Sequence, residues 1–136
     1  MQNLKEELRD ELLCWVESLK ASNTLIIVEG KKDRAALESL GIAASNIITL
    51  EGPLYRNVEK IAEMISDMAS KPKKAVILTD LDPEGKKLYS KLKKDLGEHG
   101  VEIDDRFREF LFRKTKLRQI EGLKTYMENL GLGNLE

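Results

Sequence analysis

Apolar residues in this chain occur in short continuous runs that alternate with longer amphipathic stretches. Three runs are rich in β-branched and aliphatic residues: 24–28 (TLIIV), 46–50 (NIITL) and 74–79 (KAVILT). Runs of this kind are typical of strands that are covered on both faces, as in a parallel sheet. We therefore predict one buried strand in each run.

The stretches between and around these runs have apolar residues three or four positions apart, which is the spacing of amphipathic helices. The helices predicted from this spacing cover residues 2–20, 34–41, 55–69, 83–96 and 117–131. Strand, glycine loop and helix recur three times with short connections, which favours a parallel sheet with right-handed crossovers. Two further segments, 100–104 and 107–113, are predicted as later strands.

The predicted fold class is therefore α/β, with a parallel sheet of about four strands flanked by helices. A length of 136 residues suffices for one domain with its own core, so we expect a single domain over residues 1–136. Its core covers about 22–113, with helical extensions at 1–21 and 114–136. The amphipathic end helices are suited either to pack on the sheet or to pair with a second chain or another protein.

Composition narrows the class of protein without identifying it. Charged residues make up 35% and apolar residues 41% of the chain, which excludes a disordered protein. The net charge of −1 does not by itself indicate a nucleic-acid-binding protein. It does not exclude one, because a local basic surface is sufficient to bind nucleic acid. Only two glutamines, with many lysines and glutamates, indicate a thermophile.

The single cysteine and the absence of long apolar runs bear on the compartment. Cys14 excludes a disulfide within the chain, fits a reducing cytoplasm, and is expected to be a buried or half-buried apolar residue. No apolar run approaches the roughly 20 residues of a membrane span, so no membrane partner is expected. The acidic N-terminus is unlike a signal peptide. A cytoplasmic protein is therefore expected.

Acidic residues follow each of the three predicted buried strands. Glu29 follows the first, Glu51 the second, and three acids follow the third, namely Asp80, Asp82 and Glu84. Ligands of open parallel sheets bind beyond the carboxyl ends of the strands, so Glu29 faces Asp80 and Asp82 in one site if the first and third strands are neighbours. Carboxylate oxygens suit Mg²⁺, with Mn²⁺ as an alternative. The predicted metal ligands are Glu29, Asp80, Asp82 and Glu84.

Helix capping is an alternative explanation of some of the same acids. The segment 82–84 (Asp-Pro-Glu) places an N-cap acceptor, a proline and a first-turn acid at the start of a predicted helix. Capping accounts for Asp82 and Glu84, but not for Asp80 or for Glu29 on another strand. The two interpretations are compatible, and spacing alone does not choose between them.

The residues around these acids resemble the Toprim domain of topoisomerases, bacterial primases, recombination-mediator proteins and small ribonucleases. The matching segments are 26–37 (IIVEGKKDRAAL) and 76–88 (VILTDLDPEGKKL). That family has a Glu after its first strand and an Asp-x-Asp after a later one, which correspond here to Glu29, Asp80 and Asp82. The resemblance covers about residues 22–113 and is greatest to the endonuclease that matures 5S ribosomal RNA.

The resemblance implies Mg²⁺-dependent chemistry on RNA or DNA phosphodiesters, as in a nuclease or a related phosphotransfer enzyme. Glu29, Asp80 and Asp82 would be its catalytic residues, with Glu29 as general acid or base. This sequence departs from the family at Lys86, where many members carry an acid. A non-catalytic nucleic-acid-binding adaptor and a metalloenzyme for small phosphates or nucleotides remain alternatives.

Glycines and basic residues near the same loops are candidate phosphate contacts. Gly30 and Gly52 precede predicted helices, where backbone N–H groups are suited to bind anions. The basic candidates are Lys31, Lys32, Arg56, Arg113 and Lys114. The last two belong to a basic run at 106–118, whose phenylalanines are expected to pack in the core.

Overall fold

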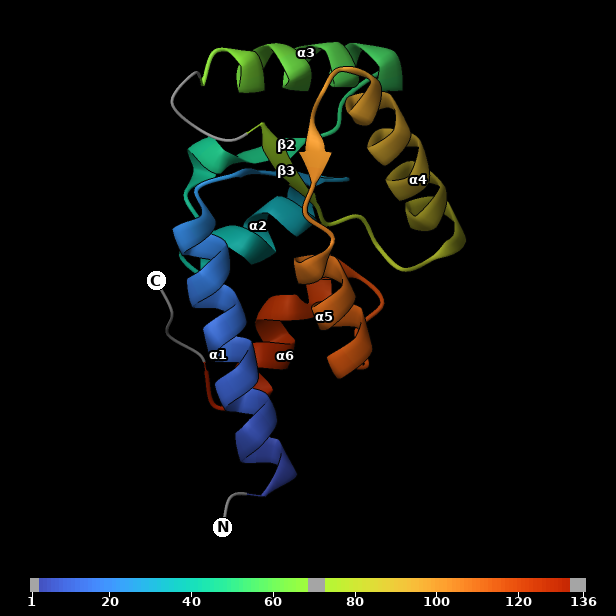
Figure 1. Ribbon diagram of the computed structural model, residues 1–136. Helices are drawn as coiled ribbons and strands as arrows, with labels where there is room; N and C mark the ends of the chain where they lie inside the picture. The colour runs from blue at the N-terminus through green and yellow to red at the C-terminus, as the bar shows by residue number, and fades with distance from the viewer. Residues whose placement is uncertain (1–2, 69–72, 133–136) are drawn as a thin grey trace.

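The computed structural model describes residues 3–68 and 73–132 and contains a four-stranded parallel sheet between two layers of helices (Figure 1). The strands lie in the order β2–β1–β3–β4. Their bounds are β1 (Leu25–Val28), β2 (Ile47–Thr49), β3 (Lys74–Ile77) and β4 (Glu102–Ile103). The predicted α/β class and the sheet of about four strands are confirmed.

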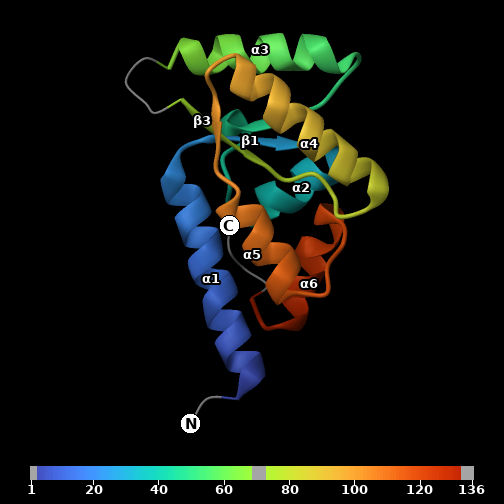
Figure 2. The same ribbon diagram turned by 45° about the vertical axis from the view of Figure 1, so that its right-hand side comes forward.

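Helices follow each strand and cover both faces of the sheet. Their bounds are α1 (Leu4–Ser22), α2 (Lys31–Ser39), α3 (Leu54–Ser66), α4 (Pro83–Glu98), α5 (Arg106–Lys114) and α6 (Leu123–Asn129). Short 3-10 turns, η1 (Ala44–Asn46) and η2 (Ile120–Gly122), precede β2 and α6. Figure 2 shows α3 and α4 together on one side of the sheet, with α1, α2, α5 and α6 on the other.

The continuous apolar runs explain this layering. Side chains alternate between the two faces of a strand. In β1, Ile26 and Val28 therefore pack with α1, α2, α5 and α6, whereas Leu25 and Ile27 pack with α3 and α4. All four are buried, which is why the run contains no polar residue.

The N-terminal helix packs on the rest of the chain through four buried residues, namely Leu12, Trp15, Val16 and Leu19. The Trp15 indole Nε1 donates a hydrogen bond of 2.9 Å to the Phe107 carbonyl oxygen, and the two rings meet edge to face. Trp15 is 5% exposed and belongs to the same apolar cluster as the sheet residues. The end helices were expected either to pack on the sheet or to pair with another chain. Helix α1 packs within its own chain.

The predicted strand at 107–113 is wrong, because these residues lie in helix α5. Phe107 and Leu111 are buried and stand four positions apart, which is helical spacing. Phe110 and Phe112 pack against the same cluster, so the phenylalanines are core residues as expected. Short apolar runs do not distinguish strand from helix by their period alone.

Smaller differences concern the bounds of other elements. Helix α2 begins at Lys31 rather than Arg34, and the helix predicted over 117–131 is a 3-10 turn followed by the short α6. The predicted strand at 100–104 is present as the two residues of β4. Helix α3 ends at Ser66, short of the helix predicted over 55–69, whose last residue lies outside the described residues. Within those residues, no helix combines the length and the hydropathy that crossing a membrane requires.

Candidate metal and phosphate site

The carboxyl ends of β1 and β3 bring Glu29 and Asp80 together. These two strands are paired in parallel, with Ile27 opposite Ile77, so the residues that follow them leave the sheet at the same edge. The Glu29 Oε2 atom accepts a hydrogen bond of 2.7 Å from the backbone N–H of Asp80. The expectation that the first and third strands are neighbours is confirmed.

The Asp80 carboxylate is also held by the first residue of η2. Its Oδ1 atom accepts a hydrogen bond of 2.8 Å from the backbone N–H of Ile120. Next to it, the Leu81 N–H donates to the Arg118 carbonyl oxygen at 2.7 Å. The acidic loop is therefore fixed between β1 and a segment about forty residues further along the chain.

Asp82 is the N-cap of α4, and its side chain accepts a hydrogen bond of 2.7 Å from the Gly85 N–H. Glu84 lies exposed in the first turn of the helix, where a negative charge is favourable. The capping interpretation of residues 82–84 is therefore confirmed. Gly85 is required here, because a Cβ atom at this position would lie 2.1 Å from the Asp80 carbonyl oxygen.

Asp33 is an acid of this site that was not predicted from the sequence. Its Oδ2 atom accepts a hydrogen bond of 3.0 Å from the Gly30 N–H, which is the N3-to-N-cap half of a capping box at the start of α2. Asp33 is 6% exposed. The Gly30 N–H, expected to face a phosphate, is therefore already engaged by a carboxylate within the chain.

Three carboxyl groups of this site have a raised pKa. Burial is the largest cause and raises the pKa of Glu29, Asp33 and Asp80 above their ordinary values. Neighbouring negative charges add to the effect: Asp80 and Asp82 act on Glu29, and Glu121 acts on both Asp33 and Asp80. Backbone N–H donors oppose it at all three. A cation bound beside these three carboxyl groups would offset both the burial and the like charge.

The donor set suits a hard divalent cation, but it is not a preformed cage. Among residues 3–68 and 73–132, no three Asp, Glu, His or Cys side chains are gathered closely enough to hold a metal ion. Glu29, Asp80 and Asp82 each accept a backbone N–H bond through one named oxygen, and the Glu29 and Asp80 side chains also interact with each other. Mg²⁺ commonly takes only one or two protein carboxylates and completes its shell with water and phosphate. The residues therefore fit a cation held in that manner.

The Arg108 side chain forms direct hydrogen bonds with the backbone of the acidic loop. Its Nε donates to the Thr79 carbonyl oxygen at 3.2 Å, and its Nη2 donates to that of Asp80 at 2.9 Å. The guanidinium also stacks on Tyr89 and Phe112, at 4.5 and 5.2 Å from the ring centroids. Burial lowers the pKa of Arg108, and the charges of nearby acids, Glu29 among them, oppose that shift.

Two of the predicted phosphate contacts meet at the end of β2. Lys31 and Arg56 line a hollow of about 430 Å³, together with Arg34 and Lys60. Gly52 adopts φ +71°, a left-handed conformation that glycine allows without strain. The Asn57 side chain fixes this loop by accepting from the Glu51 N–H at 3.1 Å and donating to the Pro53 carbonyl oxygen at 3.0 Å.

The other predicted phosphate contacts lie elsewhere. Lys32 lines a separate hollow with Gln119 and Glu121 on the far side of α2. The Lys114 Nζ atom lies 3.6 Å from Glu11 and so faces α1 rather than the acids. Arg113 is exposed on α5. The basic candidates are therefore divided between the site and other surfaces.

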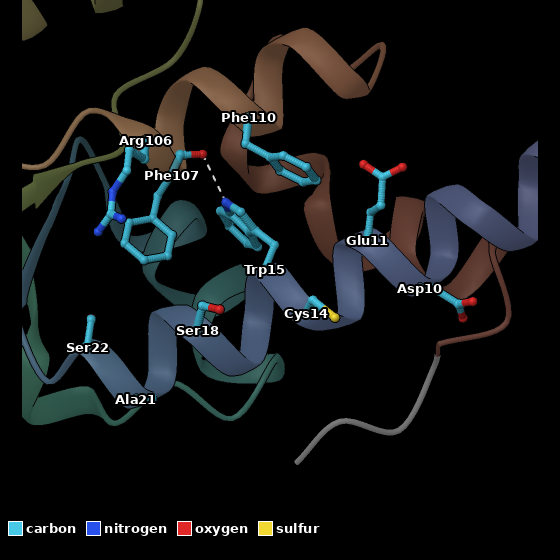
Figure 3. A pocket seen from close by; sticks show the side chains of 10 residues that line it. All are labelled: Asp10, Glu11, Cys14, Trp15, Ser18, Ala21, Ser22, Arg106, Phe107 and Phe110. Carbon is cyan, nitrogen blue, oxygen red and sulfur yellow. Dashed lines mark hydrogen bonds between the residues drawn. The ribbon is translucent and has the colours of Figure 1, made fainter.

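An apolar hollow between α1 and α5 contains none of the predicted site residues. It measures about 810 Å³ and is bordered by Trp15, Phe107 and Phe110 (Figure 3). Cys14 also borders it and is exposed, so the expectation of a buried or half-buried cysteine is wrong. The chemistry that the acids allow is therefore separate from this hollow.

Sequence reasoning missed Asp33, Arg108 and Glu121 for different reasons. Asp33 stands three residues after Gly30, and this capping-box spacing was a usable signal. Arg108 lies in the segment predicted as a strand, so the direction of its side chain could not be predicted correctly. Glu121 comes near the site only because the η2 turn packs beside α2, and no local pattern encodes that contact.

Comparison with known proteins identifies the family. The Toprim domain family model matches residues 24–110. The chain is similar to a UPF0292 protein of Methanocaldococcus jannaschii, with 29% identity over 127 residues, which cover 90% of this chain and 94% of the relative. A UPF0292 protein of Pyrococcus abyssi is 34% identical over 110 residues, covering 79% of this chain and 77% of the relative.

A solved structure has the same fold. A putative protein from Aquifex aeolicus superposes with a TM-score of 0.63 and 31% sequence identity, covering 89% of this chain and 98% of the other. The names of these relatives state no activity, and they lend no support to a closer relationship with the 5S ribosomal RNA endonuclease. Domain match, relatives and topology agree, so the chain belongs to the Toprim domain family and to the UPF0292 family.

Proposed function

We propose that the protein is a Mg²⁺-dependent enzyme of nucleic-acid phosphodiesters, either a nuclease or a related phosphotransfer enzyme. The observation that carries the proposal is the meeting of Glu29 and Asp80 at one edge of the sheet, within 2.7 Å through the Asp80 N–H. Toprim domains typically bind divalent metal ions and are associated with nucleic acids. The UPF0292 relatives leave the reaction itself open.

In this proposal, Asp80 and Glu29 hold the cation, with Asp82 and Glu84 contributing through their free oxygens or through water. A bound Mg²⁺ would neutralise negative charge on the phosphate and lower the barrier to its attack. These roles are compatible with the N–H bonds that already orient each carboxylate.

Phosphate binding is supported by the basic hollow at the end of β2. Lys31 and Arg56 line it with Arg34 and Lys60, and β2 lies next to β1, whose end carries Glu29. A positive charge one strand away is suited to bind the phosphate that follows or precedes the scissile one. Gly52 in its left-handed conformation lets the backbone turn at this rim without a side chain.

The test is cleavage of structured RNA, single-stranded DNA and duplex DNA with and without Mn²⁺ or Mg²⁺. Wild type is expected to cut at least one of them only when metal is present. Glu29→Gln keeps an oxygen acceptor for the Asp80 N–H but removes the charge, so it should abolish cleavage and leave the fold intact. Full activity of Glu29→Gln would refute the proposal, and Glu63→Gln, at an exposed position on α3, is the matched control.

A nucleic-acid-binding adaptor without catalysis is the second candidate. One observation favours it: Glu29, Asp80 and Asp82 all bond backbone N–H groups, which gives each a structural role. An adaptor is expected to retard RNA or DNA in a salt-dependent manner and to leave it uncut with either metal. Cleavage that depends on metal and is lost in Glu29→Gln would eliminate this alternative.

A further inference from the structure

Helix α4 carries a row of lysines on the face that looks away from the sheet. Leu92 and Leu96 on its other face are fully buried among residues of α3 and the sheet. The exposed face borders a shallow hollow of about 480 Å³, whose lining is Ser90 and four lysines: Lys86, Lys87, Lys91 and Lys94. We call these four residues the lysine row.

The charge of the lysine row is mostly uncompensated. Lys91 pairs with Asp95, at 3.6 Å between Nζ and Oδ2. Lys86, Lys87 and Lys94 make no ion pair with any residue in the described ranges 3–68 and 73–132. Lysines on one helix face repel one another, so helix stability gives no reason for the row. In a chain of net charge −1, the row is a local basic surface.

The lysine row starts one turn from the candidate site. The Lys86 N–H donates to the Asp82 carbonyl oxygen at 2.9 Å, and Asp82 is the N-cap of α4. From Lys86 to Lys94 the helix rises about 12 Å, at about 1.5 Å for each residue. One strand of a duplex carries three or four phosphates over about that length, at about 3.4 Å each.

We propose that the lysine row binds the backbone of a nucleic acid whose scissile phosphodiester lies at Glu29 and Asp80. This inference rests on the proposed function, and it adds where the strand runs beyond the site. Phosphate contacts of this kind bind without regard to base sequence. An anionic membrane is the less suitable partner, because a helix that lies on a membrane inserts an apolar face, and the apolar face of α4 is buried.

The test compares two triple variants with the same change in net charge. The row variant is Lys87→Glu/Lys91→Glu/Lys94→Glu. The control variant is Lys5→Glu/Lys73→Glu/Lys124→Glu, whose three lysines are exposed on α1, on the loop before β3 and on α6. Fluorescence anisotropy measures the affinity for labelled single-stranded RNA, single-stranded DNA and duplex DNA of mixed sequence, between about 50 and about 200 mM KCl.

The row variant is expected to lose roughly tenfold or more in affinity, while the control variant stays within about threefold of wild type. The slope of log K against log salt should fall by about 2 to 3, at about 0.7 to 0.9 for each phosphate contact. Circular dichroism verifies that the variants are folded. If the row variant is unfolded, the neutral variant Lys87→Gln/Lys91→Gln/Lys94→Gln takes its place, with Lys5→Gln/Lys73→Gln/Lys124→Gln as its control, and is expected to show the same order of effects.

Each remaining outcome overturns a different statement. If both triple variants weaken binding equally, or if the row variant binds as well as wild type, the lysine row does not bind the nucleic acid. The proposed function is then unaffected. If wild type binds none of the three nucleic acids, both the role of the lysine row and the proposed function are overturned. Binding to phosphatidylserine vesicles in place of nucleic acid, lost in the row variant, overturns the assignment of the partner.

Discussion

Glu29 holds the backbone N–H of Asp80 at 2.7 Å across 51 residues of sequence. The bond joins the loops that follow β1 and β3, so the same carboxylate that is a candidate ligand also ties two loops together. Removing the side chain would therefore remove structure and chemistry at once. Amide substitutions separate the two, because an amide keeps an oxygen acceptor and loses the negative charge.

Glu29→Gln is expected to stabilise the metal-free protein at neutral pH. The pKa of Glu29 is raised in the folded state by burial and then by the charges of Asp80, Asp82 and Asp33. Between its ordinary pKa and that raised pKa, the folded state binds more protons than the unfolded state, so stability is lost as pH rises. The amide removes this loss, whereas at lower pH, where the carboxyl is protonated in both states, the two proteins should converge.

Urea unfolding of wild type and Glu29→Gln between about pH 4 and pH 8 measures the difference directly. Subtracting the two free energies of unfolding removes the contributions that other titratable groups make to both proteins. Asp104 is one such group: Arg106 lowers its pKa, so its contribution to stability is larger at higher pH. Glu51→Gln at the end of β2 controls for a change of one charge. A stability difference that does not grow with pH would contradict the raised pKa.

Divalent metal is expected to stabilise wild type more than the amide variant. Mg²⁺ that binds only the folded state adds stability by mass action, about 2.7 kcal/mol at a hundredfold excess over the dissociation constant. Thermal unfolding in MgCl₂ is compared with KCl of equal ionic strength, with MnCl₂ as a second metal. Wild type should gain and Glu29→Gln should gain much less. An equal shift in both proteins would show that Glu29 is not a ligand.

The parts of this site that could be predicted are those that depend on a single strand end. Glu29 and Asp80 each follow a continuous apolar run, and parallel pairing of the two runs places their ends side by side. The Ile120 N–H that holds Asp80 could not be predicted, because it depends on how a segment forty residues later packs on the loop. Arg108 was hidden for a related reason: helix α5 was assigned to a strand, so the direction of its side chain was unknown.

Asp82 is expected to have two separable roles. Asp82→Ala removes the acceptor for the Gly85 N–H and should cost about 1 kcal/mol of stability, the usual cost of losing an N-cap. Asp82→Asn caps nearly as well, so it should retain stability but lose its share of metal binding. Urea unfolding and Mn²⁺ titration measure the two effects. If the two variants lose stability equally, charge and not capping explains Asp82.

Gly85→Ala is expected to be among the most destabilising small substitutions in the protein. The added Cβ would lie 2.1 Å from the Asp80 carbonyl oxygen, so the acidic loop must move away from α4. Such overpacking costs roughly 3 kcal/mol. Gly97→Ala on the same helix meets nothing within 4 Å and should be neutral or stabilising by a few tenths of a kcal/mol. Similar unfolding midpoints for the two variants would contradict the close approach.

Arg108 is expected to resist replacement by lysine. Its guanidinium bonds the carbonyl oxygens of Thr79 and Asp80 with two nitrogens and stacks on Tyr89. An ammonium group cannot reproduce this planar arrangement, so Arg108→Lys should lose about 1.5 to 3 kcal/mol, close to Arg108→Met. Arg106→Lys, on the same helix with a side chain 82% exposed, should leave stability nearly unchanged. Urea unfolding decides: an Arg108→Lys variant as stable as wild type would mean that positive charge alone, without the two directed hydrogen bonds, supports the acidic loop.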